Sequence, residues 1–336
     1  MENVAMPDEA DAFSLNYAQA RAKFLEAAKA GGLHVTSYPL ALPGRDGEAL
    51  AVDAAWQGPR QAAKLLLLSS GVHGVEGYAG SGAQTALLRE QAWMEQASAS
   101  GMAVLYVHAL NPYGFSHMRR VTQENVDLNR NFQDFTAPLP SNPAYCRLHP
   151  LLLPDKWPPT WANRAAILGL IATQGLRSLQ TAVSSGQYEE PGGMFFGGSA
   201  PTWSHRTLRQ LLHEHMAQVK QLAWIDLHTG LGKRGQCERI FMGANNDTAG
   251  YARANAWWGR TAPLAGASRL GDLCVGALDR AGLRCRPGGM PPSRIDRGLS
   301  GVWHEAPAGS RQRAARRPLA VPASGDTCCA AGVHQA

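Results

Sequence analysis

The chain has 336 residues, 45% of them apolar, which suits one large or two small globular domains with a substantial buried core. Its net charge of +6 comes entirely from residues 280–336, where nine Arg face three acids; 23 basic and 23 acidic residues precede them. That tail contains no recognised nucleic-acid module, and the chain has no run of about 18 apolar residues, so we expect neither a nucleic-acid partner nor a membrane partner.

The N-terminal segment carries early acidic residues and no uninterrupted apolar stretch of signal-peptide length. The six cysteines form no C-x-x-C pair and no framework typical of a small secreted domain. We therefore expect a cytoplasmic protein with reduced thiols.

In chain order, residues 14–30 form an amphipathic helical pattern, and residues 33–56 alternate around a P-G-R-D-G turn, as a hairpin would. Residues 62–70, which contain L-L-L-L, predict a strand buried on both faces. A helix is expected over residues 78–96 and another buried strand over residues 103–109.

Two further helices are expected over residues 161–184 and 204–221, and a third buried strand over residues 222–227. Strands that alternate with helices predict the α/β class, with a mixed, largely parallel, doubly wound sheet flanked by helices. In such sheets ligands gather at the carboxyl ends of the strands. Oligomeric state is not readable from this pattern.

The C-terminal segment lacks periodicity. Ala, Gly, Arg and Pro make up 33 of the 57 residues from Arg280 onward. We therefore divide the chain into one α/β domain, residues 1–285, and an irregular Arg/Ala/Gly/Pro-rich tail, residues 286–336.

Three side chains suggest a metal site. His73 and Glu76 stand three residues apart just after the L-L-L-L strand, and His228 directly follows the strand over residues 222–227. Two His and one Glu can hold zinc while leaving a position open for water. A lone His in such a place would more often cap a strand through hydrogen bonds. Because H-x-x-E and D-L-H-T-G occur together, a metal site is the favoured interpretation.

A second group of polar residues lies between the two halves of this site. Residues 111–115 read N-P-Y-G-F, Arg119 and Arg120 follow, and residues 125–132 read N-V-D-L-N-R-N-F. The rigid donors of Arg suit a substrate carboxylate and a polarised carbonyl, although a solvated basic loop is the plainer alternative.

The order of these motifs resembles that of the zinc carboxypeptidase superfamily. The motifs are, in chain order, H-x-x-E, N-P-x-G, R, V-D-L-N-R-N-F and D-L-H-T-G. The resemblance runs over about residues 14–232. It is closest to a bacterial branch of unassigned function that also resembles the succinylglutamate desuccinylase and aspartoacylase deacylases; the Q-Y-E-E-P-G-G-M-F-F-G-G loop at residues 187–198 is similar to that branch.

The resemblance implies a carboxypeptidase-like fold, one Zn²⁺ per chain, and a metallopeptidase or deacylase activity on a small-molecule or peptide substrate that carries a carboxylate. It implies these roles: His73, Glu76 and His228 as zinc ligands, Asp127 as the carboxylate that orients a ligand His, Arg120 (with Arg119 as the fallback) as the catalytic group that polarises the scissile carbonyl, and Asn129 and Arg130 as the substrate-binding pair.

The sequence departs from the family late in the chain. The family places its general-base Glu in a short strand reading L-E-[FY]-G-T, which is absent; Glu305 is the only Glu after Glu238, and its surroundings are not strand-like. When residues 299–321 are back-translated with suitable codons, the frame shifted by one base can encode C-L-E-Y-G-T. The same shifted frame then encodes an amphipathic helix. We therefore hypothesise a frameshift between about residues 265 and 298.

Three functions compete. A zinc hydrolase of C–N bonds leads, with peptide and N-acyl amino acid substrates left open. A catalytically silent zinc-binding protein is the alternative that the missing Glu favours. Nucleic-acid binding through the Arg-rich tail ranks last, and a serine hydrolase is not expected because no G-x-S-x-G occurs.

Overall fold

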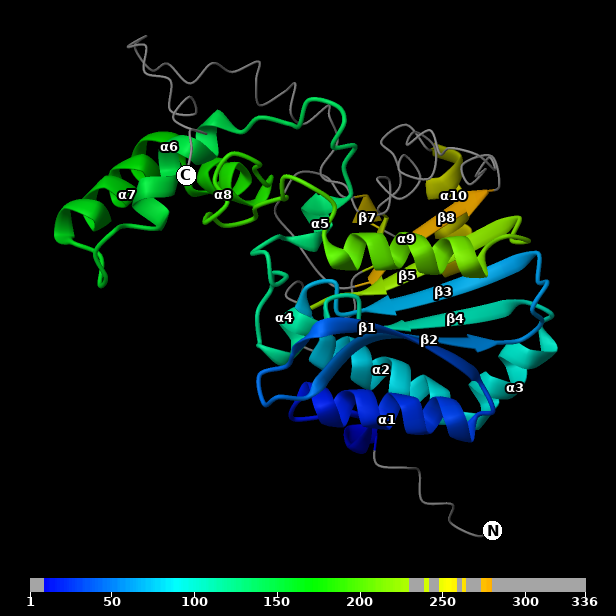
Figure 1. Cartoon of the computed structure of the whole chain (residues 1–336). Helices are drawn as coiled ribbons and strands as arrows, with labels where there is room; N and C mark the ends of the chain where they lie inside the picture. Colours follow the sequence, from blue (N-terminus) through cyan, green and yellow to red (C-terminus); the bar gives the residue numbers. More distant parts are fainter. Residues whose placement is uncertain (1–8, 230–238, 242–247, 259–261, 264–272, 280–336) are drawn as a thin grey trace, which may run out of the picture.

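The computed structural model describes residues 9–229, 239–241, 248–258, 262–263 and 273–279. Its centre is a sheet with the strand order β1-β2-β4-β3-β5-β8-β6-β7 (Figure 1). The strands are β1 (His34–Pro43), β2 (Ala49–Gln57), β3 (Lys64–Ser70), β4 (Ala103–His108), β5 (Gln221–Leu227), β6 (Arg239–Phe241), β7 (Ala262–Pro263) and β8 (Leu273–Asp279).

Parallel pairing occupies the middle of this sheet. Strand β3 pairs in parallel with both β4 and β5, whereas β1, β2 and β4 pair antiparallel with one another in turn. Strand β8 runs antiparallel to β5 and parallel to β6. Strand β6 also pairs in parallel with β7. The prediction of a mixed, largely parallel α/β sheet is confirmed, with parallel pairs at β4-β3-β5 and at β8-β6-β7.

Helices cover both faces of the sheet (Figure 1). Helices α1 (Tyr17–Ala30), α2 (Gly77–Arg89) and α3 (Gln91–Ala99) lie on one face, and α9 (Trp203–His215) lies on the other. Side chains of β3 divide between two cores, because strand residues alternate in direction: Leu67 packs in the core that includes Leu208 and Leu211 of α9, and Leu68 in the core that includes Phe24 of α1. The doubly wound arrangement is therefore confirmed.

Two predicted helices are each divided in the structure. Residues 78–96 form α2 and α3, separated at Glu90, whose backbone is extended. Residues 161–184 form α7 (Trp161–Gln174) and α8 (Leu176–Ser184), separated at Gly175, which has a φ of 80°. Glycine adopts a positive φ without the steric penalty that a Cβ brings.

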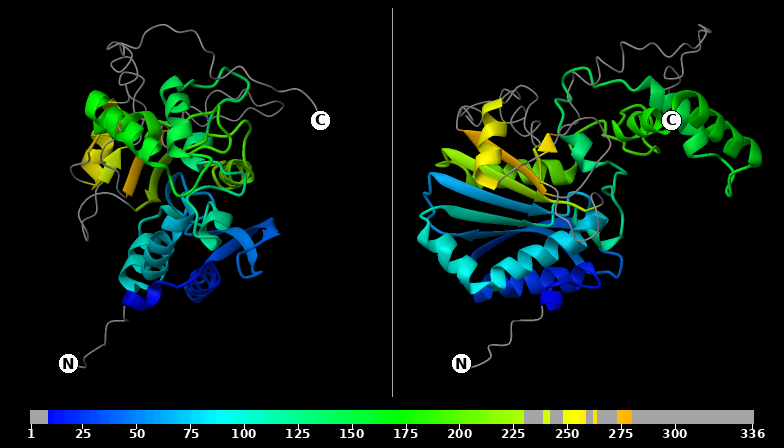
Figure 2. Two further views of the ribbon diagram at one scale, coloured as in Figure 1. Left: turned by 90° about the vertical axis from the view of Figure 1, so that its left-hand side faces the viewer. Right: turned by 180° about the vertical axis from the view of Figure 1, so that it is seen from behind.

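The remaining helices are short or peripheral: η1 (Glu9–Ala12), η2 (Gly74–Glu76), α4 (Pro112–Ser116), α5 (Leu128–Asn131), α6 (Pro143–Leu152) and α10 (Thr248–Trp258). Helices α6, α7 and α8 form a lobe that projects from the sheet-containing body in two different views (Figures 1 and 2). None of the helices in the described ranges is long and apolar enough to cross a membrane.

Several sequence predictions fall beyond these ranges. The tail over residues 286–336, which includes Glu305, lies outside the described residues. The interval proposed for the frameshift, about residues 265–298, also lies outside them except where it overlaps β8.

Candidate metal site

The candidate site lies where two neighbouring parallel strands end. Ser70, the last residue of β3, pairs in register with Leu227, the last residue of β5. His73 and His228 follow these strand ends within three residues, so both emerge at the same edge of the sheet. The parallel pairing of β3 and β5 thus brings together two His side chains that are far apart in the sequence.

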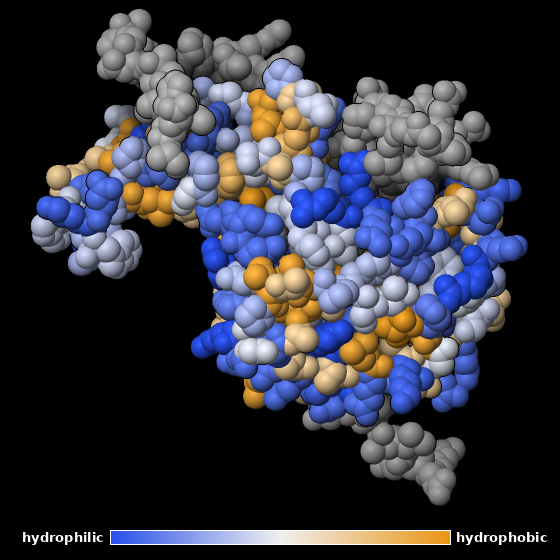
Figure 3. Space-filling model, viewed as in Figure 1, coloured by the Kyte–Doolittle hydropathy of each residue, from blue (hydrophilic) through white to orange (hydrophobic). Residues whose placement is uncertain are grey.

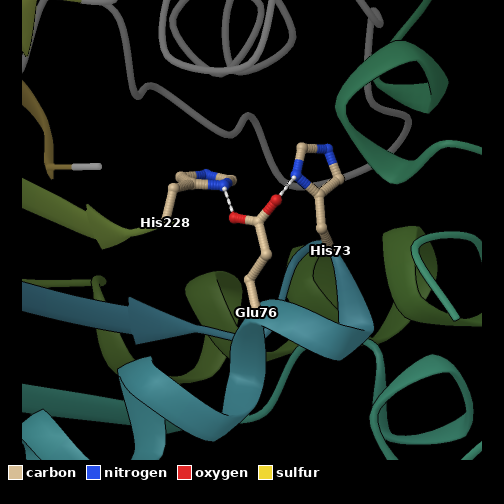
Figure 4. A group of neighbouring side chains, drawn as sticks. All are labelled: His73, Glu76 and His228. Atoms are coloured by element: carbon tan, nitrogen blue, oxygen red, sulfur yellow. Dashed lines mark hydrogen bonds and ion pairs between the residues drawn. The ribbon is translucent and has the colours of Figure 1, made fainter. Parts of the chain in front are cut away.

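Glu76 lies between the two histidines (Figure 4). Its Oε1 is 2.9 Å from Nδ1 of His73, and its Oε2 is 3.0 Å from Nδ1 of His228. One ligand atom from each of the three residues lies within 4.8 Å of the others. Within the described part of the chain, no other group of three His, Cys, Asp or Glu side chains has this arrangement.

An aspartate contacts Nε2 of each histidine, the ring nitrogen that does not face Glu76. The Nε2 of His73 is 3.2 Å from Oδ1 of Asp127, and Nε2 of His228 hydrogen-bonds to Oδ2 of Asp226. An aspartate on Nε2 keeps the proton on that nitrogen and turns Nδ1 toward the site, as metal-binding histidines usually require. Two imidazoles and a carboxylate, oriented in this way, fit a zinc ion.

The electrostatics of the cluster follow from burial and ion pairing. Burial disfavours the charged imidazolium of His228, but Asp226 and Glu76 outweigh burial and raise the pKa of His228 to about 10. Burial likewise opposes the charged form of Glu76, yet its hydrogen bonds with His228 and His73 hold the pKa of Glu76 well below its usual range. The site therefore keeps a carboxylate that is ionised at neutral pH.

A second loop packs directly on the metal-site turn. The backbone N–H groups of Gly74 and Val75 donate to the carbonyl oxygens of Arg120 and Arg119, at 3.2 Å and 3.0 Å. A Cβ on Gly74 would lie 2.1 Å from the backbone carbon of Gly114, so this approach requires glycine. The two loops are thereby fixed to each other.

This packing places Arg120 beside the cluster. Its Nε donates to Oδ2 of Asp127 at 3.0 Å, and its Nη1 lies 3.6 Å from Oε1 of Glu76. Burial would raise the pKa of the Asp127 carboxyl, but Arg120 and His73 hold that pKa well below its usual range. The neighbouring Arg119 is exposed and donates instead to Oδ1 of Asn125 at 3.2 Å.

Phe195 covers the guanidinium of Arg120. The Cζ of Arg120 lies 5.1 Å from the centre of the Phe195 ring, which is a cation–π distance. Phe195 has a φ of 53°, a conformation that a bulky residue seldom adopts. The loop is held there by its backbone: the Asp127 N–H donates to the Phe196 carbonyl oxygen at 2.8 Å.

Arg130 makes contacts that the sequence did not predict. Its Nη2 donates at 2.7 Å to the carbonyl oxygen of Ser184, the last residue of α8, and its Nη1 donates at 3.3 Å to the carbonyl oxygen of Asn129. Burial lowers the pKa of the Arg130 guanidinium. Arg130 Nε and Asn129 Oδ1 are buried without a hydrogen-bond partner among the described residues, so each retains a free polar atom.

Asp226 is the site residue that sequence reasoning missed. It occupies the strand position two residues before His228, and residues two apart on a strand share one face. Ser69 of β3 donates to its Oδ1 at 2.5 Å, which fixes the carboxylate inside the sheet. The signal was present in D-L-H-T-G, because its Asp and His are two positions apart.

Taken together, the fold and the cluster define an α/β protein with a site of the metal-binding type. A family model described as "Protein of unknown function (DUF2817)" matches residues 13–273, and the chain belongs to that family. No curated protein matches the chain in sequence.

Solved structures similar to this chain include peptidases. Carboxypeptidase A from Helicoverpa armigera is 13% identical, with a TM-score of 0.38, over 69% of this chain and 48% of its own. Bovine thrombin-activatable fibrinolysis inhibitor, in complex with tick carboxypeptidase inhibitor, is 10% identical with a TM-score of 0.44, over 74% of this chain and 70% of its own. A Zn-dependent exopeptidase from Parabacteroides distasonis is 15% identical with a TM-score of 0.21, over 32% and 49%. The chain thus spans about half the length of the first and third of these proteins.

Proposed function

We propose that this protein is a zinc-dependent hydrolase of C–N bonds in substrates that carry a carboxylate, such as peptides or N-acyl amino acids. The observation that carries the proposal is the convergence of His73, Glu76 and His228, whose ligand atoms lie within 4.8 Å of one another. The Asp partners on both imidazoles support it, because they turn the Nδ1 atoms toward a common point.

Zinc held by these three residues would lower the pKa of water toward about 7 and would polarise a scissile carbonyl. The chain's own contribution is orientation and charge. Arg120, fixed by Asp127 and covered by Phe195, presents a cation beside Glu76 and would stabilise negative charge that develops on the carbonyl oxygen. Packing and the ion pair hold this guanidinium in advance, so little reorganisation is needed during the reaction.

Adjacent arginines give a matched test of this role. We expect Arg120→Ala to lower the zinc-dependent hydrolysis of a chromogenic N-acyl dipeptide by about 10²-fold or more, since loss of one oxyanion donor typically has that effect. Arg119→Ala, which removes an exposed side chain bonded only to Asn125 in the described contacts, should stay within about twofold of the parent. Zinc content should be equal in both variants. Equal rates in the two variants would show that Arg120 takes no part in the reaction.

The substrate carboxylate is assigned to Asn129 and Arg130. Support comes from their buried polar atoms without partners, Asn129 Oδ1 and Arg130 Nε, and from the charge that Arg130 keeps next to Asp127. Of these two atoms only Arg130 Nε is a donor for an anion; the Asn129 amide nitrogen would have to supply the other.

Calorimetric binding of an N-acyl amino acid and of its amide tests that assignment without requiring turnover. Arg130→Ala should weaken binding of the acid by about 10- to 100-fold and of the amide by much less, because a charge-assisted hydrogen bond is lost only for the acid. Arg130→Lys keeps the charge but loses the planar fork, so it should recover part of the acid affinity. Equal losses for acid and amide would show that Arg130 only supports the structure.

The missing L-E-[FY]-G-T strand favours a second candidate, a zinc-binding protein of the same fold without catalysis. The two candidates differ in the dipeptide assay: the silent protein would hold zinc yet show no rate above that of free zinc. A deacylase preference over peptides and a cytoplasmic location stay predictions from the sequence.

A further inference from the structure

The lobe of α6, α7 and α8 carries an exposed apolar seam that the proposed hydrolase does not use. Helix α7 packs on α6 and α8 through its partly buried side, which includes Ile167, Leu170 and Ile171. None of its residues is buried. Its outer side carries large exposed apolar side chains: Trp161 is 83% exposed and Leu168 is 65% exposed.

The exposed residues fall on one line along the helix. Trp161, Ala165, Leu168 and Ala172 are all exposed and follow one another at spacings of four, three and four residues. That spacing defines a single face of an α-helix and is the pattern of a helix–helix seam. Helix α7 carries one charged residue, Arg164, whose Cζ lies 5.2 Å from the Trp161 ring centre at the edge of the seam.

The seam alternates large and small residues, which makes it complementary to itself. When two copies of α7 pair antiparallel about a two-fold axis between Ala165 and Leu168, Trp161 lies opposite Ala172 of the second copy, and Leu168 lies opposite Ala165. Every large side chain then meets a small one, the arrangement that lets facing helices interdigitate. An isologous contact of this kind needs only one surface patch.

Large exposed apolar side chains also lie at both ends of α7, next to the seam. Trp157, just before α7, is 82% exposed, and Leu176, just after it, is 53% exposed. Antiparallel pairing brings the Trp157 end of one copy beside the Leu176 end of the other. The two Trp side chains alone offer roughly 300 Å² of a copy's surface, given 150–250 Å² for a buried aromatic residue. A stable dimer buries about 800 Å² per partner, so they supply a substantial part.

The lobe is accessible for such a contact. Figure 2 shows α6–α8 standing away from the sheet, and Figure 3 shows apolar surface on the lobe. A lipid surface would favour a cluster of Lys or Arg side chains along the apolar face, whereas α7 itself provides only Arg164, with one exposed basic residue beyond each end, Lys156 and Arg177. A strongly charged protein partner would likewise find only one charged side chain, Arg164, on this helix.

We propose that the α7 seam is a homodimer interface in which two copies of this chain pair antiparallel through Trp161, Ala165, Leu168 and Ala172. An interface of this modest size should give a dissociation constant in the micromolar range. The metal sites of the two copies take no part in the contact, so the proposal stands independently of the hydrolase function.

Sedimentation of the full chain over about 1–100 µM tests the proposal, with neighbouring substitutions as a matched pair. The parent should shift from monomer to dimer as its concentration rises. Ala165→Glu places a carboxylate in the seam of both copies and should weaken dimerisation on the order of 100-fold, because a buried unpaired charge is costly. Ala166→Glu introduces the same charge on the same exposed helix, away from the seam, and should leave the dimer within about threefold of the parent.

Circular dichroism should show the same helix content for both variants, since Ala165 and Ala166 are exposed and the substitutions are identical. A parent chain that remains monomeric throughout the range would overturn the proposal, including a monomer that instead co-sediments with neutral lipid vesicles. A dimer equally stable in Ala165→Glu would also overturn it, because the contact would then use another surface.

Discussion

His73→Ala and His228→Ala should each reduce bound zinc from about one ion per chain to near zero after dialysis, as measured by elemental analysis. The reason lies in the geometry, since each histidine supplies one of three ligands and two ligands bind zinc far more weakly. Glu76 also loses a contact in either variant, because its two carboxylate oxygens lie 2.9 Å and 3.0 Å from Nδ1 of His73 and of His228.

His213→Ala serves as the control. His213 is an exposed imidazole in the last turn of α9, so its removal changes the number of histidines but not the cluster. Zinc should also raise the thermal midpoint of the parent and of His213→Ala, because a ligand that binds the folded state stabilises it, whereas the two site variants should gain nothing. Unchanged zinc content in His73→Ala and His228→Ala would show that the ligand assignment is wrong.

Restoring the alternative reading frame should raise hydrolysis by about 10²- to 10⁴-fold, which is the usual contribution of a positioned general base. The hypothesis rests on L-E-Y-G-T and a following amphipathic helix, which the shifted frame of residues 299–321 can encode. The family match ends at residue 273, before the segment concerned. Thermal stability should rise together with activity, since the restored helix would cover apolar surface.

Within the restored chain, Glu→Gln in the L-E-Y-G-T segment should return the rate to that of the present sequence while keeping the gain in stability. Two results would contradict the hypothesis. One is a present sequence that is fully active and loses its activity in Glu305→Gln, which would make Glu305 the base. The other is a restored chain that is neither faster nor more stable.

The centre of the sheet could be predicted because its strands carry short apolar runs that are largely buried. Strands β3 and β4 contain the apolar runs L-L-L-L and A-V-L-Y-V, β5 is apolar from Leu222 to Ile225, and no helical pattern of that length competes with them. From those strands alone, His73 and His228 could be placed at one sheet edge. The same reasoning could have identified Asp226, because it stands two positions before His228 and side chains two positions apart along a strand lie on one face.

The lobe could not be predicted in the same way. The apolar pattern of α7 continues past Gly175 into α8, so the sequence indicates one helix where a positive φ divides it. Helix α6 escaped prediction because Pro150, inside it, reads as a helix breaker, although Asn142 followed by Pro143 is a signal for the start of a helix. An apolar helix is normally expected to be buried, and periodicity does not reveal that α7 stands away from the body.

The contact between Arg130 and Ser184 links two parts of the molecule through one guanidinium. In this structure Nη2 of Arg130 donates to the end of α8, and Nε has no partner among the described residues. Because each Nη carries two N–H donors, a carboxylate bound by Arg130 would accept from Nε and the second N–H of Nη2 while the contact with Ser184 stays in place. A substrate carboxylate and the end of α8 would then share one guanidinium, and any coupling between them is reciprocal: whatever shifts α8 changes affinity for the carboxylate by the same free energy with which the ligand shifts α8.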